Sequence, residues 1–353
     1  MQQQRTPRTL PKRNGFSLLE LLVVIVVISI LVSLTLPAIY RSSCGSSKIT
    51  CLNNMRNVGL AVVNFSSGAN SELPLLVDPN KVTDADGTNA NAHRDDLSWC
   101  TTVLPFLDQV RFRQRWDATA SLAAQEGATP AQIQALTDLN QTRFPILTCP
   151  DDQFNSDPGA LSYVVNVGYV TAHYNSANDF AHHPASVDGG LDGDRSTTAD
   201  IPVKFASGVF WRPYESRMSL DFISEADGMT QTLMLSENLQ AGAWSDQDTG
   251  NLGFGVDMQG VFQSGSTSLR LPSGFELKNS VTGTDSRICS NLTAAKGQAW
   301  RPSSNHPSGA VNVIFCDGSG KSLIPQMDAS VYSRLLTPAG QRYNQRAVDG
   351  SAF

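Results

Sequence analysis

The sequence lacks the short motifs that identify common hydrolases, nucleotide-binding proteins and zinc proteins. It has no Gly-x-Ser-x-Gly, no His-Glu-x-x-His and no P-loop, so no motif predicts a nucleophilic serine, a metalloprotease or a phosphate-binding loop. Its six cysteines include no Cys-x-x-Cys pair, which leaves a zinc knuckle or a thioredoxin-like site without support. Some of these cysteines pair if the chain is exported, but the sequence does not choose among the pairings.

Positive charge is scarce after the first fifteen residues. Four of the 26 basic residues lie in that first segment with no acidic residue among them, and the other 22 stand against 32 acidic residues. The resulting balance of -10 argues against nucleic acid or anionic lipid as the main partner. At 353 residues, the chain is long enough to bury a substantial core without help from disulfides or metals.

One long apolar run is present near the N-terminus. Leu21 to Tyr40 are 20 consecutive uncharged residues, enough for a helix of about 30 Å that matches the hydrocarbon core of a bilayer. The basic flank before the run predicts that this end stays cytoplasmic. We therefore expect a single-pass inner-membrane protein whose C-terminal part is extracytoplasmic.

A cleaved secretory signal fits this run less well. Its apolar region should span only about 7–15 residues and end in an A-x-A-like site, whereas the run here is longer and has Leu36 where a small residue is needed. A lipoprotein signal at Cys44 fails because Arg41 stands where an apolar residue is required. A membrane span remains the favoured interpretation over both, and over a buried soluble helix.

The residues around the start of the run carry a resemblance. "RNGFSLLELLVVIVVISIL" resembles the prepilin leader of type IV pilins and type II secretion pseudopilins. The resemblance implies cleavage after Gly15 by a prepilin peptidase, N-methylation of Phe16, and use of the helix as membrane anchor and assembly stalk. It also places Glu20 fifth in the processed chain, and it puts Pro37 where such helices often carry a proline, which predicts a kink or local unwinding.

Glu20 is costly in lipid, by about 2.5–3.5 kcal/mol on insertion scales. Cleavage would create a positive amine at Phe16, and the amine of a neighbouring subunit could neutralise Glu20 while setting the axial stagger. The alternative is that Glu20 only snorkels to the headgroups, because it lies near the start of the span.

The helix is expected to continue beyond the membrane. Apolar residues repeat every three or four positions from Cys51 to Phe65, which indicates one buried stripe, and Gly68 is a plausible C-terminal stop. The expected organisation is a leader at 1–15, a transmembrane helix at 16–40, its continuation at 41–67 and an extracytoplasmic domain at 68–353.

The extracytoplasmic domain is expected to be α+β. "SWCTTVLPFLDQVRFRQRW" has helical character, and "TPAQIQALTDLNQ" indicates a short helix capped by Thr129 with Pro130 in its first turn. Strands are predicted at "FPILTCP", "LSYVVNVGYVTAHY", "VKFASGVFW", "QTLMLSE" and "AVNVIFCDGSGKSLI". Because runs of strands follow one long helix, we expect a pilin-like fold, with the helix packed on an antiparallel sheet that carries large loop insertions.

The last strand run predicts a β-hairpin near residues 310–324, with its turn at Asp317 and Gly318. This region resembles a large planctomycete family of prepilin-like proteins of unknown function (domain of unknown function 1559), whose hallmark is His, nine residues, then Asp-Gly. Here His306 and Asp317 enclose ten residues. Four other segments resemble the same family: "CLNNMRNVGLAVVNF", "LPFLDQ", "LTCPDD" and "ISEADGMTQTLMLSEN".

Two weaker interpretations concern chemistry in the extracytoplasmic domain. His306 and Asp317 could be neighbours at the base of the hairpin, where structural hydrogen bonding is favoured over catalysis or metal binding because spacing identifies no third ligand. Calcium is a further possibility, since it prefers carboxylate and carbonyl oxygens, and the residues offered for it are Asp188, Asp192 and Asp194. Solvated loops remain the favoured interpretation of these acidic residues.

These observations predict a membrane-anchored pseudopilin-like assembly subunit of an envelope secretion or pilus-like system, with no catalysis of its own and no cofactor. Its expected partners are a prepilin peptidase, the inner membrane and other pilin-like subunits or further copies of itself. The alternatives are a non-polymerising anchored binding protein for glycans or calcium and, less favoured, an envelope hydrolase that uses His306 and Asp317.

Overall fold

The computed structural model of the protein describes residues 18–78, 97–125, 127–154, 156–170, 205–211, 217–257, 288–289, 292–297, 301–343 and 345–348. The chain divides into two compact units, Met1–Ser46 and Ser47–Phe353. The long helix α1 (Leu18–Gly68) contributes to both. Each unit is described by itself.

In the first unit, α1 carries the apolar segment Leu18–Thr35, which is long and apolar enough to cross a membrane and has none of its residues buried. Its hydroxyl groups are satisfied within the helix. Ser29 Oγ donates to the carbonyl of Ile25 at 2.7 Å, and Ser33 Oγ donates to that of Ile30 at 2.8 Å. Internal satisfaction of this kind is required of any polar group in lipid.

In the second unit, α1 buries the predicted stripe. Cys51, Met55, Val58 and Val62 are fully buried, and Phe65 packs edge-on against Phe106. The helix lies close to the sheet at Gly59, where an added Cβ would be only 3.1 Å from Ile314 and 3.3 Å from Met234. The predicted packing of the helix on the sheet is therefore confirmed, and so is the helix end at Gly68.

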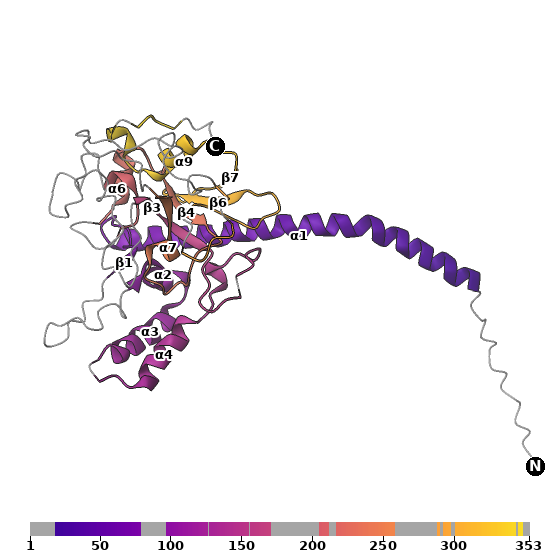
Figure 1. Cartoon of the computed structure of the whole chain (residues 1–353), viewed down its shortest axis with the longest axis horizontal. Coiled ribbons are helices and arrows are strands. Elements are labelled where there is room, and N and C mark those ends of the chain that lie inside the picture. The colour runs from indigo at the N-terminus through magenta and orange to yellow at the C-terminus, as the bar shows by residue number, and fades with distance from the viewer. Residues whose placement is uncertain are drawn as a thin grey trace, which may run out of the picture. The chain divides into compact units, whose positions relative to one another are not determined.

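The main sheet has five strands in the order β5-β3-β4-β6-β7 (Figure 1). The strands are β3 (Tyr163–Val170), β4 (Leu233–Glu237), β5 (Gly253–Asp257), β6 (Val311–Phe315) and β7 (Gly320–Leu323). All neighbours are antiparallel except β3 and β5, which are parallel. Two short strands, β1 (Val77–Asp78) and β2 (Leu97–Ser98), pair separately.

The α+β class is confirmed, but the sheet is not wholly antiparallel as predicted. After β4 the chain passes β3 and adds β5 on the far side, and strand β5 was not predicted. Since β5 runs opposite to β4, as β3 does, it is necessarily parallel to β3. This crossover contains the short helix α7 (Thr249–Leu252).

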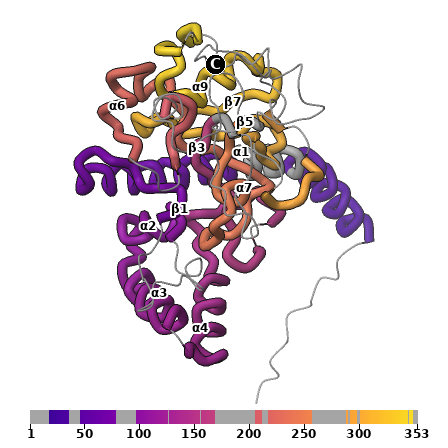
Figure 2. Tube along the Cα trace, turned by 60° about the vertical axis from the view of Figure 1, so that its left-hand side comes forward, coloured from indigo at the N-terminus to yellow at the C-terminus, as the bar shows by residue number. Residues whose placement is uncertain are grey.

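Most helices of the second unit lie around the sheet or form a separate helical hairpin. The hairpin consists of α3 (Val110–Ala123) and α4 (Pro130–Asn140), and both views show it at the opposite end of the unit from α9 (Ala329–Leu336) (Figures 1 and 2). Thr129 caps α4 in a capping box with Gln132, as its sequence predicts. The remaining helices are α2 (Trp99–Val103), η1 (Leu104–Leu107), η2 (Pro145–Leu147), α6 (Leu220–Glu225) and η4 (Gly340–Tyr343).

Two predicted strands are wrong. "FPILTCP" forms the 3-10 helix η2, which begins at Pro145, because the fixed φ of proline suits a helical first turn and its missing N–H cannot join a sheet ladder. The described part of "VKFASGVFW" has a short helical turn and then a loop. In that loop, Val209 and Phe210 both donate their N–H to the carbonyl of Asn166. The hairpin β6–β7 is formed as predicted.

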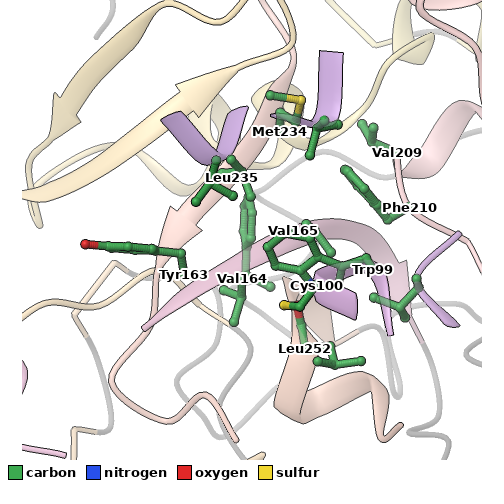
Figure 3. Close-up of a cluster of buried hydrophobic side chains, with 14 of the residues drawn as sticks. Trp99, Cys100, Tyr163, Val164, Val165, Val209, Phe210, Met234, Leu235 and Leu252 are labelled. Atoms are coloured by element: carbon green, nitrogen blue, oxygen red, sulfur yellow. The ribbon is translucent and has the colours of Figure 1, made fainter. Parts of the chain in front are cut away.

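The core is buried on both faces of the sheet. Successive side chains of a strand point to opposite faces, and Tyr163, Val164 and Val165 of β3 are all fully buried. Figure 3 shows them among side chains from the flanking segments, including Trp99, Phe210 and Leu252. The sheet, buried on both faces, holds the residues at the ends of β4 and β6 in place.

Candidate functional site

The residues predicted for processing and for calcium binding lie mostly outside the described part of the chain. This applies to Gly15 and Phe16, and to the calcium candidates Asp188, Asp192 and Asp194. Glu20 lies in the first described turn of α1 and is exposed. The helix is continuous in its backbone through Pro37, without the local unwinding considered above, and the kink stays a prediction.

His306 is the centre of a buried polar cluster in the second unit. It begins the turn His306-Pro307-Ser308-Gly309, which is closed by the N–H of Gly309 on the carbonyl of His306 at 2.8 Å. Pro307 occupies the second position of this turn, where its fixed φ is favourable. Ring atom Nδ1 of His306 lies 2.7 Å from Asp151 Oδ2, and Nε2 lies 3.0 Å from Glu237 Oε1.

Glu237 is held in place by the neighbouring strand. It ends β4, its side chain is 3% exposed, and its Oε2 accepts the backbone N–H of Asn312 on β6 at 2.8 Å. The Asn312 side chain donates through Nδ2 to Glu237 Oε1 at 3.2 Å and to the carbonyl of Lys48 on α1 at 3.2 Å. The cluster therefore ties the sheet to the stalk helix.

A disulfide adjoins this cluster. Cys51 of α1 is bonded to Cys149, which follows η2, and Cys149 Sγ lies 4.0 Å from His306 Nε2. Asp151, two residues after Cys149, is the only member of the group whose side chain retains appreciable exposure, at 21%. Covalent and polar links thus join α1, the η2 segment, β4 and the His306 turn at one place.

The geometry indicates that His306 is an imidazolium. Both ring nitrogens face carboxylate oxygens, which accept hydrogen bonds and cannot donate when ionised, so the arrangement favours a proton on each nitrogen. Burial acts to lower the pKa of His306, but the hydrogen bond and charge of Glu237, and then those of Asp151, outweigh it and raise the pKa above its ordinary value of 6.5. Geometry and pKa direction both favour the protonated form of the ring between the two carboxylates.

We expect this arrangement to make stability depend on pH. A group with a raised folded pKa contributes its full stability below its unfolded pKa, about 6.5 for histidine, and the contribution is lost as the pH rises through the folded pKa. The groups that face the ring are Asp151, Glu237 and Asn312. Thermal unfolding of the oxidised wild type and of His306→Gln, measured from about pH 6 to about pH 9, checks this. The difference in Tm between the two should shrink as the pH rises, and a constant difference would contradict the expectation.

A small cavity adjoins Glu237 and the disulfide. It has room for about one water molecule. Its floor includes Asp152, which is buried and accepts hydrogen bonds from Ser162 Oγ at 2.6 Å and from the N–H of Phe154 at 2.8 Å; burial raises the pKa of its carboxyl. The lining residues are Cys149, Asp152, Ser162, Glu237, Asn238, Leu239, Ser303, Ser304 and Asn305.

His306 and Asp317 are not the neighbours that the sequence suggested they could be. Asp317 is exposed in the β6–β7 turn, where its Oδ1 accepts the N–H of Ser319 at 2.8 Å, and Gly318 follows with a positive φ of 81°. Hairpin geometry turns this aspartate toward solvent, whereas His306 points into the domain. Asp317 and Gly318 therefore shape the turn, and His306 belongs to the separate cluster.

The residues that complete the site were not singled out from the sequence, although they lie in segments that carried the family resemblance. Cys51 begins "CLNN", Cys149 and Asp151 lie in "LTCPDD", and Glu237 lies in "LSEN". The sequence offered one signal for these residues, which is that each of the three segments contains a cysteine or an acidic residue. Spacing could not reveal it, because the segments lie far apart in the chain: Cys51 and Cys149 are 98 positions apart, and Glu237 and His306 are 69 apart.

Two family models match the chain, one over its N-terminal segment and one over most of the remainder. The model of a family described as "Protein of unknown function (DUF1559)" matches residues 48–330, and the model of the "Prokaryotic N-terminal methylation motif" matches residues 10–36. The first match contains the whole cluster around His306, and the second contains Gly15, Phe16 and Glu20. No curated protein and no solved structure matches the chain.

Proposed function

Because the chain belongs to the DUF1559 family and carries the prokaryotic N-terminal methylation motif, we propose that it is a membrane-anchored, pseudopilin-like subunit that assembles with pilin-like subunits in an envelope secretion or pilus-like system. The prepilin-type motif makes it a pilin-like protein processed by a prepilin peptidase. The observation that carries the proposal is that this motif overlaps the exposed apolar segment Leu18–Thr35 of α1.

The long helix supports a role in assembly. One stretch of it is suited to a bilayer, and the stretch from Cys51 to Phe65 packs on the sheet of the second unit. In this proposal the apolar stretch anchors the chain in the inner membrane in a single pass, with the DUF1559 domain on the extracytoplasmic side. The domain would then contact cargo or neighbouring subunits.

No catalytic role is proposed. The side chains of His306 and Glu237 are only 1% and 3% exposed, so a substrate would have no access to them. Their hydrogen bonds join separate segments of the fold, which is a structural task. The candidate site thus supports the stability of the domain that the stalk carries.

Glu20 provides the test of assembly. We expect Glu20→Val to leave leader removal intact and to reduce cross-linked multimers in membranes by about tenfold or more, because coupling between close charge pairs at interfaces is commonly about 1.5 kcal/mol or larger. Ser29→Val is the matched control, since Ser29 is also polar within the span but bonds to the carbonyl of Ile25 in its own helix. The mass of the mature N-terminal peptide and cross-linking of the full chain are the measurements.

Three outcomes would contradict the proposal or the role that it gives to Glu20. Wild-type protein that stays monomeric in membranes would remove the assembly role and favour the non-polymerising anchored binding protein. Multimers that survive Glu20→Val unchanged would show that this carboxylate does not direct assembly. If Ser29→Val loses as many multimers as Glu20→Val, any substitution of a polar residue in the apolar segment has this effect, and the carboxylate of Glu20 has no special role.

A further inference from the structure

Four buried side chains from separate segments bring metal-ligating atoms into one small volume. They offer two sulfur atoms, one imidazole nitrogen and one carboxylate oxygen, all within 4.8 Å of one another. This four-ligand cluster consists of Cys51, Cys149, Glu237 and His306. We propose that, once its disulfide is reduced, the four-ligand cluster binds one divalent metal ion of the zinc type.

The set of donor atoms matches the preference of zinc. Thiolate, imidazole and carboxylate are its usual ligands, at about 2.0–2.3 Å, and a tetrahedral arrangement at those lengths places neighbouring ligand atoms about 3.3–3.8 Å apart. His306 Nε2 lies 3.0 Å from Glu237 Oε1 and 4.0 Å from Cys149 Sγ. These distances bracket the tetrahedral spacing, so small shifts of side chains suffice. The two sulfur atoms must move apart, which breaking their bond permits.

Neighbouring groups hold two of the four ligands in position by hydrogen bonds, as they do around many protein metal sites. Metal-binding histidines commonly donate their second N–H to a carboxylate, and His306 has Asp151 Oδ2 at 2.7 Å from Nδ1. The glutamate is oriented likewise, because its Oε2 accepts the backbone N–H of Asn312 at 2.8 Å. Four protein ligands and nearly complete burial indicate a closed, structural site. The adjoining cavity borders both Cys149 and Glu237.

Redox chemistry decides which state the cluster adopts. A dithiol reductant gives two electrons to the Cys51–Cys149 bond and becomes a disulfide itself, while the two cysteines take up two protons and become thiols. Metal binding then releases those two protons and the Nε2 proton of His306 to solvent. The Nδ1 proton stays on the ring, directed at Asp151. The same two cysteines thus form either the disulfide or half of the metal site.

The test uses the full chain in detergent micelles. The protein is reduced with dithiothreitol, freed of reductant by anaerobic gel filtration, and given Zn²⁺ for metal analysis or Co²⁺ as a spectroscopic probe. We expect one Zn²⁺ per chain in the reduced protein, at least tenfold less in the oxidised protein, and Co²⁺ absorption bands typical of four-coordinate thiolate ligation. Cys149→Ser should lose this binding, and Cys100→Ala, which removes a buried free cysteine outside the cluster, should keep it.

A second variant separates loss of metal binding from loss of the fold. Asp151→Asn retains all four ligands and the disulfide, and it should weaken Zn²⁺ binding by about 10–100-fold, as loss of an orienting partner does. Far-UV circular dichroism follows the fold in each state. If the reduced chain unfolds, Zn²⁺ should restore its secondary structure. The proposal is overturned if the reduced chain neither binds Zn²⁺ nor refolds with it, if oxidised and reduced chains bind equally, or if Cys149→Ser and Asp151→Asn bind like the wild type.

Discussion

Glu237→Ala should lower the free energy of unfolding of the oxidised protein by about 3–5 kcal/mol, because it removes one of the two carboxylates that face the buried His306 ring. The ring of His306 would keep Asp151 but lose the carboxylate on Nε2, and the N–H of Asn312 would lose its acceptor. Both groups are buried, so water cannot easily replace the lost contacts. Denaturant unfolding of the full chain in micelles measures the change.

The matched control is Glu225→Ala. Glu225 is a glutamate in α6 whose side chain is exposed, and substitutions at such positions usually change stability by less than about 0.5 kcal/mol. Glu237→Gln separates charge from shape, since the amide keeps an acceptor oxygen but removes the negative charge. A loss of less than about 1 kcal/mol in Glu237→Ala would show that the cluster does not stabilise the fold as argued.

Removal of the disulfide is the second large effect that we expect. Cys51 and Cys149 are 98 residues apart, and the chain-entropy model gives about 4.7 kcal/mol for a closed loop of about 100 residues. The double variant Cys51→Ala/Cys149→Ala should therefore lose about 2–5 kcal/mol, near the upper end of the usual range. Chemical denaturation in the presence of a chelator isolates this effect from any bound metal.

Reduction of the wild type in the same buffer provides an independent comparison. It breaks the S–S bond and opens the same loop, but it removes no side-chain atom. It should therefore reproduce most of the loss of stability. Cys289→Ala is the control, because Cys289 is a free, partly exposed cysteine. If the double variant is as stable as Cys289→Ala, the disulfide does not constrain the unfolded chain in the way proposed.

Glu237 and the Cys51–Cys149 disulfide belong to one structural junction. The disulfide joins α1 to the segment after η2, and the Asn312 side chain joins β6 to the carbonyl of Lys48 on α1. The DUF1559 domain is therefore attached to its stalk both covalently and through buried hydrogen bonds. Such a junction fixes the part of α1 that belongs to the second unit against the rest of that unit.

Local features of the fold could be predicted well from the sequence. The spacing of Cys51, Met55, Val58 and Val62 predicted the buried stripe of α1, and Gly68 marked its end. Thr129 and Pro130 predicted the start of α4, and the Asp317-Gly318 turn predicted the β6–β7 hairpin. Each of these depends on residues within a few turns of helix or one tight turn.

Predictions failed where a local pattern had two possible outcomes. "FPILTCP" has the apolar character of a strand, but Pro145 starts a 3-10 helix there. The sequence "GFGVD" of β5 is too short and rich in glycine to indicate a strand. It forms a strand because the crossover after β4 brings it beside β3. The two strands approach so closely that a Cβ added to Gly255 would clash with the carbonyl oxygen of Gly168.

The sequence by itself determined the long apolar segment, the prepilin-type motif and the family, because the apolar run and the register of Gly15, Phe16 and Glu20 are properties of neighbouring residues. Only the tertiary structure decided that His306 contacts Asp151 and Glu237 in place of Asp317, and that Cys51 pairs with Cys149. Those contacts join residues far apart in the chain. Their pairing depends on how α1, η2, β4 and β6 pack, which spacing along the sequence does not encode.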